Sequence, residues 1–126
     1  MKRNPRYHWL GALQPSRARA LLGFADAFVL SSRSEGGANA LGEAIVAGVP
    51  VLASRVAGSI GLLGRSYPGY FAPGDTAALT RLLLRVETDS AFRARLRRAV
   101  SARAKLFSEA RESAAWRALL KEMAAA

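Results

Sequence analysis

Two carboxylates enclose a pair of glycines near the middle of the chain, and their spacing suits a site that binds a phosphorylated sugar. Glu35 stands directly before Gly36 and Gly37, and Glu43 follows in a Glu-x7-Glu pattern. Glycines let a ligand approach the backbone closely, and the unpaired N–H groups of a helix's first turn can hold phosphate oxygens with the help of the helix dipole. A carboxylate accepts two hydrogen bonds from a vicinal diol, so we expect each glutamate to bind hydroxyl groups.

The donors that we expect around a diphosphate are the backbone amides of this turn and of the helix that follows it. They belong to Gly37, Ala38, Asn39, Ala40 and Leu41, and Asn39 can add its side-chain amide. At about 1.5 Å per residue, Glu43 lies roughly 6 Å along the axis from the helix start, so hydroxyls on both sides of a bound diphosphate come within reach. A nucleotide-sugar has this layout, with a sugar, a diphosphate and a ribose in a row.

Simpler interpretations of the same residues remain open. A glycine pair before a helix is often only a turn, and Glu43 could be a surface residue or the partner of an arginine. Arg33 and Arg55 follow the two neighbouring predicted strands and could either balance phosphate charge or face solvent. His8, the one histidine, is more typical of a structural strand residue than of a catalytic base.

Buried strands and helices are expected on both sides of the turn. The pattern predicts a strand over 26–31, a helix over 38–47 that Gly48 ends and Pro50 keeps from resuming, and a strand over 51–54. The apolar residues of the first strand do not alternate, which is typical of a parallel sheet covered by helices on both faces. Ligands collect beyond the carboxyl ends of the strands in such sheets, and the turn lies there.

The remaining elements complete an α/β unit. We expect a short strand over 6–10, a helix over 17–24 and a fourth strand over 70–72, which a glycine-punctuated segment separates from the strand before it. Three C-terminal helices are each predicted to begin at a capping residue, namely Asp75, Asp89 and Ser108. The predicted fold is therefore α/β, a Rossmann-like parallel sheet followed by C-terminal helices.

The composition excludes several kinds of chemistry. The chain of 126 residues has no cysteine and one histidine, which removes disulfide scaffolds and thiolate sites and argues against a histidine metal cage. We therefore expect neither a metal nor a cofactor. The N-terminus carries charge without an apolar run behind it, and the longest uncharged apolar stretch, 44–53, is far short of the roughly 20 residues that cross a bilayer. We expect a soluble, cytoplasmic chain.

Strong basicity raises a rival hypothesis, a nucleic-acid-binding module. The formal net charge is +10, and one predicted helix carries Arg93, Arg95, Arg97, Arg98, Arg103 and Lys105. These cations fall on two flanks of the helix, and no aromatic stacking platform accompanies them. A solvated helix face therefore explains them better than a helix that binds in a nucleic-acid groove does. Sixteen of the 19 cations are arginine and 26 residues are alanine, a skew that GC-rich coding produces by itself. We therefore do not expect nucleic acid as the partner.

Four runs of residues carry a resemblance that extends from Arg6 to Ser108. They are 9–11, 25–32, 35–44 and 47–54. In these runs the chain resembles the retaining glycosyltransferases of the GT4 branch, whose GT-B fold has two facing Rossmann-like domains. The resemblance implies a C-terminal, donor-binding domain that takes a nucleotide-sugar as its substrate and needs no metal.

The resemblance also implies roles for the predicted site residues. Glu35 is the catalytic candidate and, with Gly36 and Gly37, contacts the hydroxyls of the donor sugar. Glu43 contacts the ribose of the nucleotide, and the backbone of the turn and of the first helical turn contacts the diphosphate. Gly37 stands where the family usually has an aromatic residue, and Gly61 lies near the place of an absent acidic residue, so the identity of the sugar stays open.

A narrower resemblance covers three segments, 35–39, 56–64 and 67–71. They are similar to the selenosugar synthases of selenoneine biosynthesis, which belong to the same branch and join selenophosphate to a sugar from a UDP-sugar. This similarity implies a UDP-sugar as donor and selenophosphate as acceptor.

Finally, the resemblance implies that residues 1–126 form only part of a donor-binding domain. A complete enzyme of this kind has an N-terminal acceptor domain and two further strands before 7–10, and the Arg/Lys pair that neutralises the diphosphate lies on that part. In the Rossmann strand order 3-2-1-4-5-6 the two strands would lie between 7–10 and 28–31. Either 7–10 then pairs directly with 28–31, or both strands leave unpaired edges that favour association with the missing half or with a second copy. We expect the isolated chain neither to transfer sugar nor to bind UDP-sugars tightly. A non-catalytic remnant that completes a separate chain is a third hypothesis.

Overall fold

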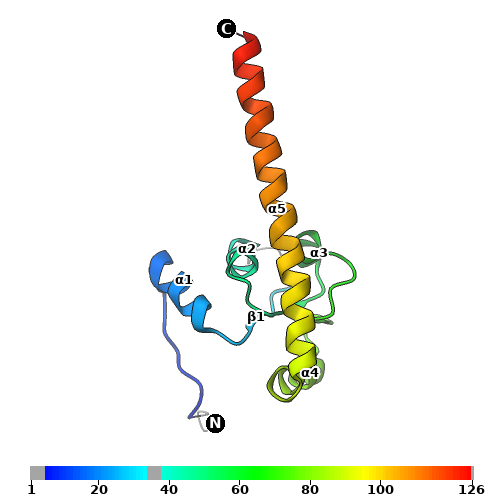
Figure 1. The fold of residues 1–126 in the computed structure, drawn as a ribbon. Helices are drawn as coiled ribbons and strands as arrows, with labels where there is room; N and C mark the ends of the chain where they lie inside the picture. The colour runs from blue at the N-terminus through cyan, green and yellow to red at the C-terminus, as the bar shows by residue number, and fades with distance from the viewer. Residues whose placement is uncertain (1–4, 34–37, 126) are drawn as a thin grey trace.

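The chain folds as a three-stranded parallel sheet with five helices among the residues that the computed structural model describes, 5–33 and 38–125 (Figure 1). In chain order the elements are α1 (Pro15–Phe24), β1 (Phe28–Leu30), α2 (Ala38–Ala47), β2 (Val51–Ser54), α3 (Ala57–Leu63), β3 (Tyr70–Phe71), α4 (Thr76–Thr88) and α5 (Ser90–Ala125). The strands lie in the order β1-β2-β3. Both crossovers run in the same direction across the sheet, so right-handed connections put α2 and α3 on one face, where they pack against each other. The predicted α/β class is confirmed.

The central strand β2 forms the middle of the core. All four of its residues are buried, including Ser54, because helices cover both faces of this strand. Its partners are in register, with Phe28 opposite Val51 in β1 and Tyr70 opposite Ala53 in β3. The edge strand β1 is less protected, since Val29 keeps 39% of its surface exposed. The predicted full burial of β1 is therefore wrong, and only β2 has the environment that its apolar run implies.

Local sequence signals explain the turn between α2 and β2. Gly48 adopts a φ of +74°, a left-handed conformation that ends the helix at little cost only for glycine. Its N–H bonds the carbonyl of Ile45, and the N–H of Val49 bonds the carbonyl of Ala44. Pro50 then leads directly into β2 and is buried. The predicted helix over 38–47 and the predicted strand over 51–54 are both confirmed with these bounds.

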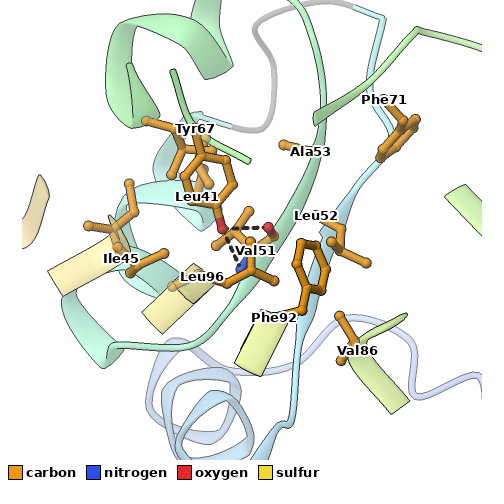
Figure 2. Close-up of a cluster of buried hydrophobic side chains, with 13 residues drawn as sticks. Leu41, Ile45, Val51, Leu52, Ala53, Tyr67, Phe71, Val86, Phe92 and Leu96 are labelled. Carbon is orange, nitrogen blue, oxygen red and sulfur yellow. Dashed lines mark hydrogen bonds between the residues drawn. The ribbon is translucent and has the colours of Figure 1, made fainter. Parts of the chain in front are cut away.

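Tyr67 completes the sheet where β3 is too short to do so. Its hydroxyl accepts a hydrogen bond from the N–H of Val51 at 3.0 Å and donates one to the carbonyl of Val51 at 2.6 Å (Figure 2). The pairing of backbone groups resumes one step later, where the N–H of Ala53 bonds the carbonyl of Gly69. A Cβ on Gly69 would collide with the carbonyl oxygen of Val51, so glycine is required for this close approach. A side-chain hydroxyl thus stands in for the missing strand residue.

The core joins residues from nearly every element. The buried hydrophobic cluster comprises Leu41, Ala44, Ile45, Val51, Leu52, Ala53, Leu63, Tyr67, Phe71, Val86, Phe92, Leu96 and Val100 (Figure 2). The α4 and α5 members repeat at helical spacing, and α5 packs against α2, α3 and α4. The core therefore lies between the sheet and the proximal half of α5.

Two of the three predicted C-terminal caps are confirmed. The Asp75 carboxylate accepts a hydrogen bond from the Ala78 N–H at 2.9 Å, and the Asp89 carboxylate accepts one from the Phe92 N–H at 3.1 Å. The predicted break at Ser108 is wrong, because α5 continues as one helix from Ser90 to Ala125. No glycine or proline interrupts this stretch, so a residue that can cap a helix does not by itself start a new one.

The distal half of α5 projects away from the rest of the structure (Figure 1). Its large apolar residues stay exposed; they are Trp116, Leu119, Leu120 and Met123. The part of the chain described by the structure contains no helix that is long and apolar enough to cross a membrane.

One further prediction is wrong at the level of secondary structure. Residues 6–10 form no strand, and Tyr7, Trp9 and Leu10 are exposed, because β-forming residues make a strand only where another strand pairs with them. The glycine-punctuated segment after β2, for which the sequence predicted no element, contains the helix α3, in which Gly61 is exposed and a Cβ on it would meet nothing within 4 Å.

Candidate functional site

The carboxyl ends of the three parallel strands lie at one edge of the sheet, and each strand leads toward the start of a helix. β1 is followed along the chain by α2, β2 by α3 and β3 by α4. The α4 start is capped by the side chain of Asp75, whereas the N-cap residue of α3, Val56, provides no side-chain hydrogen bond. We call this edge the carboxyl edge. The predicted turn at 34–37 connects β1 to α2 in the sequence and lies outside the described residues.

A buried serine ties the first two strands together at the carboxyl edge. The Ser54 hydroxyl lies 2.5 Å from the carbonyl oxygen of Ser32 and 3.4 Å from that of Leu30, both at the end of β1. Because Ser54 is fully buried, this hydrogen bond satisfies a group that would otherwise be costly inside the core. It also fixes where Arg33 and Arg55 leave the sheet, since each follows one of the two serines directly. Sequence reasoning missed Ser54; the polar residue at the end of an apolar strand is the signal that could have found it.

The predicted site residues divide into those the structure describes and those it does not. Glu35, Gly36 and Gly37 lie outside the described residues. Ala38 and Asn39 begin α2, as predicted for the first helical turn, and Ala40 is exposed there. The side chain of Leu41 is fully buried, so Leu41 has only its backbone amide to offer a ligand.

Glu43 lies on the exposed side of α2. Leu41, Ala44 and Ile45 form the buried face of this helix, and Glu43 is placed about 200° around the axis from Leu41. Among the described residues the one ion pair joins Arg85 and Asp89, so none of the described arginines holds the Glu43 carboxylate. Of the two simpler interpretations of Glu43, an arginine partner finds no support in the described part of the chain, and an unengaged surface carboxylate stays open beside the ribose ligand.

The two arginines at the carboxyl edge have different surroundings. Arg55 extends over the ring of Tyr70, with its Cζ 5.3 Å from the ring centroid, and its Nη1 donates to the carbonyl of Arg65 at 3.4 Å. Arg33 lies against Gly74 in the loop that follows β3. Both Arg33 and Arg55 are exposed.

Tyr70 links β3 to the end of α3 beneath Arg55. Its hydroxyl lies 2.7 Å from the carbonyl oxygen of Gly64 and 3.2 Å from that of Ser59. Burial raises the pKa of the Tyr70 phenol, and the positive charges of Arg55 and Arg103 oppose that rise. Burial likewise raises the pKa of Tyr67, although the backbone hydrogen bond from Val51 opposes it. Both phenols are therefore protonated at neutral pH and act as hydrogen-bond donors.

Two other polar residues near the sheet have no catalytic surroundings in the described structure. Ser59 is buried inside α3, and its hydroxyl finds no hydrogen-bond partner among the described residues. His8 is exposed in the segment before α1, so it is not the strand residue that we expected. Nowhere in residues 5–33 and 38–125 do three histidine or acidic side chains come together in a group that could hold a metal ion.

Part of the basic character of α5 serves packing. Arg93 donates to the carbonyls of Val86 and Glu87 at the end of α4. Arg103 donates to the carbonyl of Leu62 at 2.8 Å and to that of Gly61 at 3.3 Å. These two arginines therefore join α5 to the ends of α4 and α3, where unpaired helix carbonyls attract cations.

The α/β architecture and its carboxyl edge agree with a comparison of the sequence with known protein families. The profile of the family described as Glycosyl transferases group 1 matches residues 2–105. The chain belongs to this family. The match covers every element from α1 to α4 and the proximal part of α5, which is the part that packs against the sheet. A search of curated proteins found no significant match to the chain.

Membership in the glycosyltransferase family sets the class of chemistry, the transfer of a glycosyl group. The carboxyl edge is then the region where the structure offers helix N-termini and exposed arginines, and Glu43 adds an exposed carboxylate on α2.

Proposed function

We propose that the chain is the donor-binding portion of a retaining glycosyltransferase that transfers a sugar from a UDP-sugar to an acceptor. The observation that carries the proposal is the start of α2 at the carboxyl edge of a parallel sheet, within a chain of the glycosyltransferase family. Several first-turn N–H groups of α2 can donate hydrogen bonds to a ligand, because an α-helix leaves its first four N–H groups without intrahelical partners. Such a helix start favours the negative charge of a diphosphate.

The proposed roles follow from the order of groups along the donor. The diphosphate binds the amides from Gly37 to Leu41, Glu43 binds the ribose hydroxyls, and Glu35 with Gly36 and Gly37 binds the sugar. The exposure of Glu43 supports its proposed role as a ribose ligand, because the ribose of a donor can reach the carboxylate without displacing a partner among the described residues. No metal takes part in this scheme, since the backbone dipoles of the helix start supply positive potential.

A polypeptide that carries an acceptor domain is the partner that we propose for this chain. β1 is the edge strand of the sheet, and nothing among the described residues pairs with its second edge. An unpaired strand edge favours association with another strand. We therefore expect a chain that carries an acceptor domain to complete the sheet at β1, with self-association as the competing outcome.

Co-expression with the protein encoded upstream tests this proposal. The co-purified pair should release UDP from a UDP-sugar when an acceptor is present, whereas the chain alone should not. Glu43→Gln should lower turnover by the pair about tenfold, the loss of about 1.4 kcal/mol that one charge-assisted hydrogen bond contributes. Glu87→Gln, a change in an exposed acidic residue on α4, is the matched control. A pair that forms and never turns over any UDP-sugar would instead favour the non-catalytic remnant.

We further propose selenophosphate as the acceptor. In this reaction a lone pair on selenium attacks the anomeric carbon, the bond from that carbon to the UDP oxygen breaks, and UDP leaves with the bonding electrons. Mass spectrometry of the product should show the selenium isotope pattern together with the mass of the sugar. Turnover with other acceptors and none with selenophosphate would overturn this narrower proposal and leave the glycosyl transfer intact.

Nucleic-acid binding is the alternative function, and the packing of α5 argues against it. Arg93 and Arg103 are engaged with backbone carbonyls of α4 and α3. Of the six cations from Arg93 to Lys105, the four that remain exposed are Arg95, Arg97, Arg98 and Lys105. Crosslinking at residues 35–43 that UDP suppresses would support the donor site, and crosslinking to RNA through α5 would support the alternative.

A further inference from the structure

Arg33 extends over the carboxyl edge toward the loop that follows β3. Arg33 follows the end of β1. A Cβ placed on Gly74 would nevertheless lie 2.8 Å from Nη2 of Arg33 and 3.6 Å from Cζ of Arg33. In the strand order β1-β2-β3, the strand β2, which ends at Ser54, lies between β1 and β3. The guanidinium therefore reaches from the end of the first strand to the loop after the third.

Gly74 makes room for this position. Its φ of +81° is left-handed, and a separation of 2.8 Å is shorter than any ordinary contact between a Cβ and a side-chain nitrogen. A Cβ at position 74 would therefore require the guanidinium, the flexible end of Arg33, to shift from this position. Gly74 differs in this from two other glycines with positive φ: a Cβ on Gly48 would meet nothing within 4 Å, and a Cβ on Gly64 would make only an ordinary contact, at 3.7 Å, with the Arg103 guanidinium.

The charge of Arg33 has no acidic partner in the described part of the chain. The described residues contain one ion pair, between Arg85 and Asp89. Asp75 is the acidic residue next to Gly74, and its carboxylate caps α4 by accepting from Ala78. A guanidinium presents five N–H donors in a planar fork that matches phosphate oxygens. At the carboxyl edge it therefore has the geometry to bind an anion.

We propose that Arg33 binds the phosphate oxygens of the donor diphosphate and supplies positive charge to the site from within this chain. The inference rests on the proposed donor site at α2. It adds a side chain that extends toward the loop after β3, whereas the amides belong to the helix that follows β1. Ser54 supports the arrangement, because its hydrogen bond to Ser32 fixes the backbone directly before Arg33.

Arg55 offers the matched control. It also follows a strand at the carboxyl edge and is also exposed. Its guanidinium, however, is held over the ring of Tyr70 and bonded to the carbonyl of Arg65. Removing its charge, like removing that of Arg33, takes one positive charge from the edge, but it leaves the proposed phosphate ligand in place.

The test is a titration of the full 126-residue chain with UDP, and separately with inorganic pyrophosphate, in which two-dimensional NMR spectra are recorded at each ligand concentration. In the wild-type chain, both ligands should bind weakly and shift the Arg33 side-chain signal and the Gly74 amide. Arg33→Gln should raise the dissociation constant about tenfold, which corresponds to about 1.4 kcal/mol, and Arg55→Gln should change it less than twofold. Gly74→Ala, which requires the guanidinium to shift, should weaken binding in the same direction but by less than Arg33→Gln, whereas Gly48→Ala, with a similar φ and open space around it, should leave binding unchanged.

The outcomes separate the two proposals. If the amides of Ala40 and Leu41 shift with an unchanged dissociation constant in Arg33→Gln, the donor site stands and the role of Arg33 is overturned. If Arg33→Gln weakens binding while the α2 amides never respond, Arg33 binds anions and the proposed donor site at α2 falls. If neither ligand shifts any signal at the carboxyl edge, both proposals fail.

Discussion

Replacing Tyr67 with phenylalanine tests how this small sheet is closed. The change removes one oxygen and leaves both the N–H and the carbonyl of Val51 without the partner that they have at 3.0 and 2.6 Å. Val51 is fully buried and Tyr67 is 5% exposed, so water does not reach these groups in place of the hydroxyl. Each buried backbone group left unpaired costs about 1–3 kcal/mol. We expect Tyr67→Phe to lower the free energy of unfolding by about 3 kcal/mol, taking the lower half of the range for each group.

Urea unfolding followed by circular dichroism measures this loss. With a slope of about 2 kcal/mol per molar urea, the midpoint should fall by about 1.5 M while the slope stays unchanged. Tyr70→Phe is the matched control, because its hydroxyl bonds carbonyls at the partly buried end of α3; there we expect a loss of about 1 kcal/mol. A loss below about 0.5 kcal/mol for Tyr67→Phe would show that the tyrosine hydroxyl does not replace a strand residue.

Three other predictions concern stability. Burial raises the pKa of Tyr67 and of Tyr70 above the ordinary 10.0, so the unfolded chain loses these protons first. The stability that the two phenols contribute should be complete below pH 10 and should decline as the pH rises above it, and Tyr67→Phe should flatten that decline in urea unfolding at a series of pH values. Asp75→Ala should cost about 1 kcal/mol by removing the cap of α4, and Asp75→Asn should restore most of the loss in thermal unfolding; equal effects of the two variants would contradict the cap. Ending the chain after Ser108 should leave the free energy of unfolding within about 0.5 kcal/mol of the full chain, because residues 113–125 are exposed, whereas Leu96→Ala should cost about 3 kcal/mol; a large effect of the truncation would show that the distal α5 packs against the fold.

The elements that the sequence predicted best are those whose ends depend on local chemistry. Helix α2 ends at a glycine that must adopt positive φ, and α4 begins at an aspartate whose carboxylate reaches the helix N–H groups. The central strand β2 was predictable because burial on both faces requires a continuous apolar run. These signals lie within a few residues of the feature that they determine.

The errors concern features that depend on partners far away in the chain. The aromatic segment at 6–10 has the composition of a strand but no strand beside it among the described residues. Likewise, Ser108 could cap a helix, but the helix that precedes it simply continues. The bridge from Tyr67 to Val51 and the position of Arg33 beside Gly74 join residues 16 and 41 positions apart, and no periodicity reveals such contacts.

For the candidate site, the sequence predicted the first turn of α2 at the carboxyl edge, and the structure places that helix start there. The roles of Glu35, Gly36 and Gly37 stay predictions because those residues lie outside the described part. The role of Glu43 also stays a prediction, although its exposure and lack of an ionic partner among the described residues are compatible with binding a ribose.

Photolabelling the co-expressed pair with an azido derivative of UDP-glucose tests most directly whether the donor binds at the start of α2. Cleavage after Arg33 and Arg55 releases residues 34–55 as one peptide, which holds the whole predicted turn and all of α2. We expect the label on this peptide, and we expect excess UDP to suppress it. Labelling that falls on the basic stretch of α5 instead, or that UDP does not suppress, would contradict the donor site.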